Sequence, residues 1–200
     1  MEFKNLPQIS PFLNFQEYYL KAEEYDQKFS EAGCISSVDD DNKPHSRFVN
    51  FKYFFEESLI FFSSYKSVKA NNFEVNKNIC INFWWPSIET QVRVEGTISK
   101  CEEKFSDEHF FGRDAGKNIA AMISNQSEEI ESYDLLKQKY EAAKQKIDSG
   151  EIQQSRPDNW GGYQVKVNYF EFWEANESRL NYRECYKKKN DEWIKFHLQP

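Results

Sequence analysis

The spacing of apolar residues predicts short strands that are interrupted by helical segments. Near the N-terminus, Ser10-Pro11 is a pair typical of a helix start, with Ser as the cap and Pro at the first helical position. An apolar stripe at helical spacing follows this pair: Phe12, Phe15, Tyr19 and Ala22. We therefore expect an N-terminal helix over about residues 10–29.

The apolar runs after this helix are short and are separated by acidic segments and by Pro86, which is typical of strands joined by turns. We predict strands over residues 33–38, 47–54, 59–63, 79–84 and 91–100, and later over 162–167, 170–174, 179–187 and 192–197. A short helix over 67–76 would interrupt the first group. In the 91–100 segment, polar Gln91, Arg93 and Glu95 alternate with apolar residues, so one face of this strand would be polar and could hold a ligand.

Residues 106–150 interrupt the strands with helical spacing. Segments 106–111 and 117–123 predict short helices, and 132–149 predicts a long one that Gly150 could terminate. Strands, inserted helices and further strands predict a mainly β, α+β fold, a closed or nearly closed antiparallel β-barrel flanked by helices. Because no Gly/Pro/Ser-rich linker divides the chain, we expect a single domain over residues 1–200.

Composition narrows the possible partners. A net charge of -7 argues against binding to nucleic acid or to an anionic membrane, because both need a basic surface. Eighteen Phe, eleven Tyr and five Trp indicate a buried interface, a pocket for a planar ligand, or a Phe-rich core. The four cysteines and three histidines lack metal-ligand spacing, so we expect no metal site. The absence of a targeting pattern and of a long apolar run predicts a cytoplasmic protein that does not enter the membrane.

Basic residues on the predicted strands are candidates for anion binding. Arg179, Asn181 and Arg183 alternate along one predicted strand and would share a face, where clustered positive charge favours an anionic partner. Arg47 and Lys52 are five residues apart, which places them on opposite faces or ends of a strand. They could serve two different anions, or they could protect a strand edge from aggregation.

Further polar and aromatic residues could complete a ligand site. Lys69 lies near a predicted helix start, where free amides and the helix dipole can hold a phosphate, although an ordinary solvated helix start has the same composition. Gln91 could hydrogen-bond a planar heterocycle, and Gln126-Ser127 adds polar groups in a loop. Trp173 fits either a stacking wall or the core.

Together these segments resemble the pyridoxamine 5'-phosphate oxidase family over about Pro11 to Pro200. The stretches that carry the resemblance are RFVNFK at 47–52, QVRVEG at 91–96, QS at 126–127, WGGY at 160–163, EFW at 171–173 and RL at 179–180. The resemblance implies an antiparallel, Greek-key split β-barrel that binds FMN at the subunit interface of a homodimer. Family members oxidise pyridoxine or pyridoxamine 5'-phosphate to pyridoxal 5'-phosphate, with molecular oxygen as the electron acceptor.

The resemblance also implies roles for individual residues. Those implied to contact FMN are Arg47, Lys52, Phe62, Ser63, Lys69, Gln91, Gln126, Ser127, Trp173 and Arg183. Those implied to contact the phosphate-bearing substrate are Lys52, His109, Arg113, Lys117, Arg179 and Asn181. Within the second set, Arg179 and Asn181 would be catalytic, because they would lie over the substrate ring.

Four positions differ from the usual family pattern. Val68 stands where an arginine helps to hold the FMN phosphate, and Asn181 where a histidine accompanies Arg179. His109 replaces a tyrosine and Lys117 a serine near the substrate phosphate.

We predict from this resemblance an FMN-dependent oxidase that makes pyridoxal 5'-phosphate. The positions that differ keep two alternatives open. His109, Lys117 and Asn181 would also suit a related FMN-dependent oxidoreductase with another small-molecule substrate. Val68 and Asn181 would suit a flavin-binding protein without catalytic activity.

Overall fold

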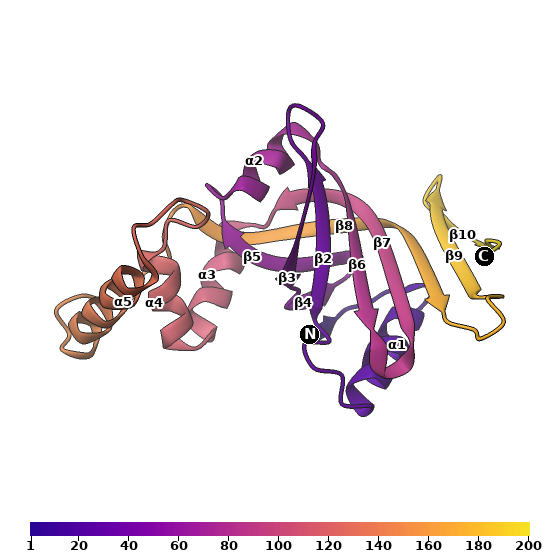
Figure 1. Ribbon diagram of the computed structural model, residues 1–200, viewed down its shortest axis with the longest axis horizontal. Helices are drawn as coiled ribbons and strands as arrows, with labels where there is room; N and C mark the ends of the chain where they lie inside the picture. Colours follow the sequence, from indigo (N-terminus) through magenta and orange to yellow (C-terminus); the bar gives the residue numbers. More distant parts are fainter. The chain divides into compact units, whose positions relative to one another are not determined.

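A computed structural model describes residues 1–200, which form two compact units (Figure 1). Unit 1 comprises Met1–Phe61, Asn72–Ser99 and Gln164–Pro200, and unit 2 comprises Phe62–Asn71 and Lys100–Tyr163. Ten strands form one sheet, and the helices are fewer and mostly short. The fold is therefore mainly β with helices, as the sequence predicts.

The strands join mostly antiparallel neighbours. They are β1 (Glu2–Lys4), β2 (Ala32–Val38), β3 (Pro44–Asn50), β4 (Tyr53–Phe55), β5 (Ser58–Ser64), β6 (Asn78–Trp85), β7 (Thr90–Lys100), β8 (Trp160–Glu174), β9 (Tyr182–Lys189) and β10 (Glu192–His197). The order in the sheet is β1-β4-β5-β8-β7-β6-β2-β3, and β9 pairs with both β8 and β10. The pair β1–β4 is parallel, so this short strand departs from the predicted antiparallel arrangement.

The structure departs most from the predicted strands over residues 47–54, 162–174 and 179–187. The expected strand over 47–54 is divided into β3 and β4, whereas the two expected strands over 162–174 form the single strand β8. β8 is continuous because its backbone has hydrogen-bond partners along this stretch. Val167 N donates to Glu57 O, and residues 169–174 pair with β9. β9 begins at Tyr182 rather than at 179, because Arg179 has a φ of 63° and so cannot continue an extended strand.

Helix α1 (Phe12–Glu24) packs its aromatic stripe against the sheet of unit 1. Phe12 and Phe15 are fully buried, and both contact Phe54 and Phe170 through edge-on or tilted ring contacts. Such ring pairs contribute about 0.5–1.5 kcal/mol each beyond the apolar area that they bury. Within unit 1, the Phe-rich composition therefore serves the core.

The ends of α1 differ from the predicted 10–29 helix. Pro11 occupies the N-cap position, and the Ser10 side chain donates to Asn14 Oδ1 instead of capping a backbone N–H. The helix ends at Glu24, because Asp26 and Phe29 adopt φ values of 55° and 56°.

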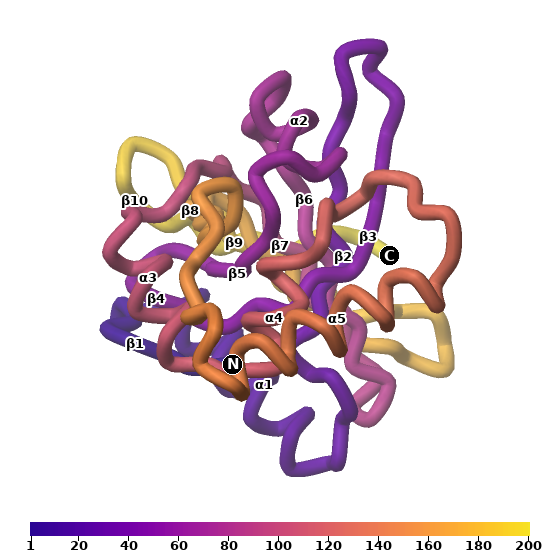
Figure 2. Tube along the Cα trace, turned by 90° about the vertical axis from the view of Figure 1, so that its left-hand side faces the viewer, coloured from indigo at the N-terminus to yellow at the C-terminus, as the bar shows by residue number.

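Unit 2 carries most of the helical insertion. Helix α3 (Glu103–Gly112) is followed by α4 (Ala115–Ile123) and α5 (Tyr133–Asp148), and α2 (Val68–Val75) begins in this unit. Asp114 caps α4 by accepting from Lys117 N, and Gly150, with a φ of 77°, follows the end of α5 as predicted. α4 and α5 lie side by side (Figures 1 and 2). None of the helices is long and apolar enough to cross a membrane.

Gly161 and Gly162 at the start of β8 allow close packing within unit 2. A Cβ atom on Gly161 would collide with the Tyr65 hydroxyl, and one on Gly162 would lie 2.8 Å from Cys101 Sγ. The sequence left open whether these glycines serve a bend or a close approach to a ligand. In the structure both lie within the strand, and the groups that approach them are side chains of this chain.

A buried carboxylate connects α1 to the C-terminal strands of unit 1. Glu184 on β9 has a side chain only 9% exposed, and it accepts hydrogen bonds from Tyr182 (2.6 Å), Tyr186 (2.6 Å) and Asn14 (2.9 Å). Lys195 Nζ lies 2.5 Å from the same carboxylate. Although burial acts to raise it, the hydrogen bonds from Lys195 and the two tyrosines lower the pKa of Glu184 from 4.5 to about 2.

We predict that Glu184→Gln lowers the free energy of unfolding by about 1.5–3 kcal/mol at pH 7, because charge-assisted hydrogen bonds are lost. The folded pKa lies below the unfolded one, so this contribution is complete above about pH 4.5 and is lost as pH falls towards 2. Urea unfolding at several pH values measures both effects. Glu192→Gln, at an exposed position on β10, is the control. A difference between Glu184→Gln and wild type that is as large at pH 2.5 as at pH 7 would contradict this role.

Candidate functional site

One face of the sheet in unit 1 gathers residues that suit a planar polar ligand. Gln91 on β7 pairs with Trp84 on β6, and the Trp84 and Trp173 ring centroids are 6.4 Å apart. Trp173 on β8 pairs in turn with Arg183 on β9. Because paired residues share a face, Gln91, Trp173 and Arg183 lie on the same surface, which we call the tryptophan face. The structure thus brings together three of the residues predicted to contact FMN.

Two ion pairs connect the strands of this face. Glu171 on β8 accepts from Arg93 Nη2 at 2.7 Å and from Arg183 Nε at 2.8 Å. Although burial acts to raise it, the hydrogen bonds from Arg93 and Arg183 hold the pKa of Glu171 below its usual value. Burial acts to lower the pKa of Arg93, yet its hydrogen bond with Glu171 and nearby acidic groups raise it above the ordinary value. Both side chains therefore stay charged at neutral pH.

Sequence reasoning did not single out Arg93 or Glu171 as site residues. The alternation in β7 indicated that Arg93 shares the face of Gln91, which was the available signal. The Glu171 partner could not be found that way, because it lies 78 residues away in sequence.

Arg47 on β3 lies on the face of the sheet opposite the tryptophan face. It pairs across the β2–β3 ladder with buried Ile35, and its Nη1 donates to Ser37 Oγ at 2.8 Å. Asn72 Nδ2 donates to the same hydroxyl at 3.0 Å. Burial lowers the pKa of Arg47. Lys52, five residues later, lies beyond the end of β3 with its Nζ 3.4 Å from Glu31 Oε1, so the predicted separation of the two cations is confirmed.

Arg179 and Asn181 do not share a strand face with Arg183, so that prediction is wrong. Both precede β9, and Arg179 N donates to Asn176 O within an exposed turn. The Asn181 side chain accepts from Asn176 N at 3.1 Å and thereby closes this loop. The strand alternation fails here because the turn residue Arg179 takes up a left-handed conformation.

In unit 2, hydrogen bonds gather several predicted FMN contacts. Ser63 Oγ donates to Gln126 Oε1 at 3.0 Å, and Ser64 N donates to the same oxygen at 2.9 Å. Lys69, buried on the first turn of α2, donates from Nζ to Ser63 Oγ at 3.1 Å. A buried ammonium, a hydroxyl and an amide so close together form a donor set that suits a phosphate.

A pocket of about 240 Å³ in unit 2 collects positive charge next to these residues. Its lining residues are Ser64, Arg113, Lys117, Ala120, Ala121, Ser124, Gln126, Asn159 and Trp160. Arg113 lies 4.1 Å from the centre of the Trp160 ring, and its Nε donates to Asn118 Oδ1 at 2.5 Å. Burial lowers the pKa of Arg113 to about 10, so it remains cationic at neutral pH. Two predicted substrate residues, Arg113 and Lys117, therefore share one pocket with Gln126.

His109 lies outside the lining of this pocket but within the same unit. Its ring stacks on Phe62, with centroids 3.6 Å apart and an angle of 7° between the planes. Trp160 is nearly parallel to both rings. The imidazole and Phe62, which are predicted to contact substrate and FMN respectively, thus form one stacked aromatic group.

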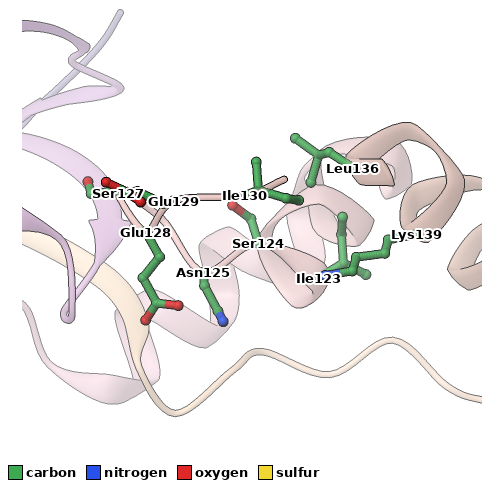
Figure 3. Close-up of a pocket in the computed structure, with 9 residues that line it drawn as sticks. All are labelled: Ile123, Ser124, Asn125, Ser127, Glu128, Glu129, Ile130, Leu136 and Lys139. Atoms are coloured by element: carbon green, nitrogen blue, oxygen red, sulfur yellow. The ribbon is translucent and has the colours of Figure 1, made fainter. Parts of the chain in front are cut away.

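Ser127 and Val68 do not line the pocket that contains Arg113 and Lys117. Ser127, with a φ of 76°, lines another pocket of about 160 Å³ in unit 2. Figure 3 shows this pocket between the loop after α4 and the α5 residues Leu136 and Lys139. Ser127 therefore lines a different pocket from its neighbour Gln126. Val68 is the first residue of α2 and is 47% exposed.

Two solved structures show the fold of this chain. PhzG from Burkholderia lata, in complex with tetrahydrophenazine-1-carboxylic acid, has a TM-score of 0.89 at 22% identity and covers 97% of this chain and 94% of its own. A pyridoxamine 5'-phosphate oxidase-related, FMN-binding protein from Nostoc punctiforme has a TM-score of 0.75 at 13% identity, with coverages of 97% and 100%. The chain accordingly has the split-barrel fold of these two proteins.

Sequence comparison defines the family. Residues 23–147 match the family described as pyridoxamine 5'-phosphate oxidase, and residues 160–200 match the pyridoxine 5'-phosphate oxidase C-terminal dimerisation region. Pyridoxine/pyridoxamine 5'-phosphate oxidase 2 of Hydrogenovibrio crunogenus is 37% identical over 191 residues, covering 96% of this chain and 89% of that protein. The corresponding enzyme of Leptospira biflexa is 33% identical over 192 residues, with coverages of 96% and 90%. The chain belongs to the pyridoxamine 5'-phosphate oxidase family.

Members of this family are FMN-dependent oxidoreductases, so the chain is an enzyme whose cofactor is FMN. The donor sets of the two units fit the chemistry of that cofactor. In unit 2, Lys69 and Ser63 provide cationic and hydroxyl donors of the kind that a phosphate needs. In unit 1, the amide of Gln91 and the indole of Trp173 are suited to a planar ring with donors and acceptors on its edge.

Proposed function

We propose that this enzyme oxidises pyridoxine or pyridoxamine 5'-phosphate to pyridoxal 5'-phosphate, with molecular oxygen as the electron acceptor. The observation that carries the proposal is the pocket of unit 2, where Arg113 and Lys117 meet Gln126. A phosphate-bearing ring needs fixed cationic donors at one end, and this pocket has them. The relatives named as pyridoxine/pyridoxamine 5'-phosphate oxidases support the same substrate class.

Arg113 and Lys117 would bind the substrate phosphate. Asn118 and the Trp160 ring hold the Arg113 guanidinium in place, so little side-chain freedom is lost when an anion binds. Lys117 lies within the first turn of α4, where the helix dipole also favours an anion. Lys52 and His109 stay further candidates for substrate contact, on the family resemblance alone.

We propose FMN contacts within each unit, taken by itself. Lys69, Ser63 and Gln126 in unit 2 are suited to the phosphate end, and Arg47 in unit 1 carries a further buried cation. Those suited to the ring are Gln91, Trp173 and Arg183 on the tryptophan face. Phe62 and Ser127 are proposed as contacts from the family resemblance.

Arg179 and Asn181 would act at the reacting end of the substrate. Bound FMN supplies the acceptor for the hydride that the substrate carbon loses. Arg179 would place its guanidinium over the substrate ring, and the exposed loop that carries it allows approach from solvent. Asn181 would hold that loop in shape through its hydrogen bond with Asn176 N, rather than moving a proton as a histidine could.

An anaerobic reduction assay tests the proposed reaction. FMN-loaded protein mixed with pyridoxine 5'-phosphate or pyridoxamine 5'-phosphate should lose the yellow absorbance of oxidised flavin as pyridoxal 5'-phosphate forms, and admitting oxygen should restore that absorbance with formation of hydrogen peroxide. Pyridoxine without phosphate is the control, because it cannot use Arg113 and Lys117. Flavin that stays oxidised with both phosphorylated compounds would rule out this substrate class.

We predict that Arg179→Ala slows this flavin reduction by about a hundred-fold, the usual cost of losing one positioned charge at a reacting group. FMN affinity should change little, because Arg179 lies outside the tryptophan face. Lys189→Ala, which removes an exposed positive charge from the β9–β10 hairpin, is the matched control. Stopped-flow reduction and titration of the apoprotein with FMN measure the two quantities. Equal losses in both would contradict the role of Arg179.

A related oxidoreductase with another substrate is the second candidate. The observation that favours it is that Asn181 uses its side-chain oxygen within the loop, where the family has an ionisable histidine. PhzG, with the same fold, is in complex with tetrahydrophenazine-1-carboxylic acid, which has a carboxylate. Reduction of the flavin by a carboxylate-bearing donor but by neither phosphorylated vitamer would favour this candidate.

We also propose that the enzyme is a homodimer with FMN at the subunit interface. Residues 160–200 match the family's dimerisation region. Phe48 on β3 pairs with Cys34, Cys34 pairs with Asn82, and Asn82 pairs with Arg93. Phe48 therefore lies on the same outward face of the sheet as Arg93. Phe48 is 72% exposed. An aromatic side chain exposed to this extent suits a surface that a second copy of the chain covers.

Phe48→Glu should therefore convert the protein to a monomer and weaken FMN retention, since it places a charge in the proposed interface. The fold should persist, because the side chain is exposed within one chain. Phe29→Glu, at a residue that is 75% exposed in the turn before β2, is the matched control. Light scattering coupled to size exclusion measures the mass. A Phe48→Glu protein that remains dimeric would exclude this part of the sheet from the interface.

A further inference from the structure

We propose that Glu171 is a positioning residue that fixes the direction in which Arg183 presents its guanidinium to FMN. This inference rests on the proposed function, in which Arg183 contacts the cofactor. Glu171 would act through Arg183 and would not touch FMN itself.

The geometry around Glu171 favours a positioning role over a direct one. Its side chain is only 3% exposed, and both carboxylate oxygens are occupied by side chains of this protein. Oε1 accepts from Arg183 Nε at 2.8 Å and lies 2.6 Å from Arg183 Nη2. Oε2 accepts from Arg93 Nε at 3.0 Å and from Arg93 Nη2 at 2.7 Å. The carboxylate is therefore held between two guanidinium groups, each in a two-pronged contact.

Arg183 is held on a third side as well. Its Nη1 donates to the backbone oxygen of Gln199 at 2.8 Å, and Leu198 N donates to Arg183 O. Every nitrogen of this guanidinium thus has a protein partner. A long, flexible arginine is thereby restricted to one orientation next to its cross-strand partner Trp173.

Arg93 fixes Glu171 in turn. The Arg93 guanidinium lies 4.7 Å from the centre of the Tyr169 ring and also pairs with Glu95. The Tyr169 hydroxyl donates towards Glu171 Oε2 at 3.4 Å. Because Arg93 and Gln91 lie on the same face of β7, the position of Arg183 is linked to the strand that carries another proposed FMN contact.

The charges explain why a carboxylate is needed here. Arg93 and Arg183 would repel each other across β8 without Glu171, and each would lose its two-pronged partner. A glutamine has the same shape, but it has a single acceptor oxygen and no charge. We therefore expect Glu171→Gln to loosen Arg183 while leaving the size of the side chain unchanged.

The test is a double-mutant cycle on FMN affinity, measured by fluorescence titration of the apoprotein. Glu171→Gln should weaken FMN binding about ten-fold or more in the wild-type background, the effect of losing a charge-assisted hydrogen bond. In an Arg183→Ala background the same change should have almost no further effect. Glu174→Gln, three residues along β8 and bonded to Tyr18, is the matched control and should bind FMN like wild type.

Other results would overturn the inference. A Glu171→Gln protein that binds FMN within two-fold of wild type, or an equal loss in both backgrounds, would show that Glu171 does not act through Arg183. Thermal unfolding of each apoprotein separates this coupling from a general loss of stability, which would not depend on Arg183.

Arg183→Lys covers the case in which Glu171→Gln does not fold. Lysine keeps the charge but cannot make a two-pronged contact, so FMN affinity should fall about as much as expected for Glu171→Gln. Unchanged affinity would overturn the inference. No substrate enters any of these titrations, so a coupled pair in an enzyme that fails to oxidise pyridoxine 5'-phosphate would refute only the proposed reaction.

Discussion

Side chains in a strand alternate between the two faces of a sheet, and in unit 1 this alternation separates the core from the surface proposed to bind FMN. Val92 and Val94 of β7 are fully buried, whereas Gln91 and Arg93, which alternate with them, face outward. The same period in β8 buries Phe172, whose ring stacks on Tyr18 of α1, and turns Trp173 outward. Burial of the Phe-rich core therefore dictates which residues can reach the tryptophan face, because a shift of one residue would exchange the two sets.

A buried carboxylate in unit 1 needs partners, because burying its charge alone is costly. Glu171 meets this need with Arg93 and Arg183, and Glu184 does so with Lys195 and hydroxyl groups. The two carboxylates belong to neighbouring strands, but they have different roles. Glu184 connects α1 to the C-terminal strands, whereas Glu171 lies among the residues proposed to bind FMN.

The sequence predicted most elements because their apolar spacing is local. The β10 strand agrees with its predicted range, and α5 ends within one residue of it. The prediction failed where the bounds of a strand depend on partners distant in sequence or on the conformation of a turn. β8 is continuous because β9 pairs with it, and the positive φ of Arg179 excludes Arg179 and Asn181 from β9. The single-domain organisation, the individual site roles and the cytoplasmic location stay predictions.

The sequence by itself determined the family, the cofactor class and the position of the basic residues along the chain, because motifs and alternation are properties of neighbouring residues. Only the tertiary structure decided which of them meet. In the folded chain, the Arg113 guanidinium packs against the Trp160 ring, and Ser63 donates a hydrogen bond to Gln126. The His109 ring stacks on Phe62, and Glu171 pairs with two arginines. These contacts join residues that are 12 to 78 positions apart. The path of the folded backbone sets such distances, and no local pattern in the sequence records them.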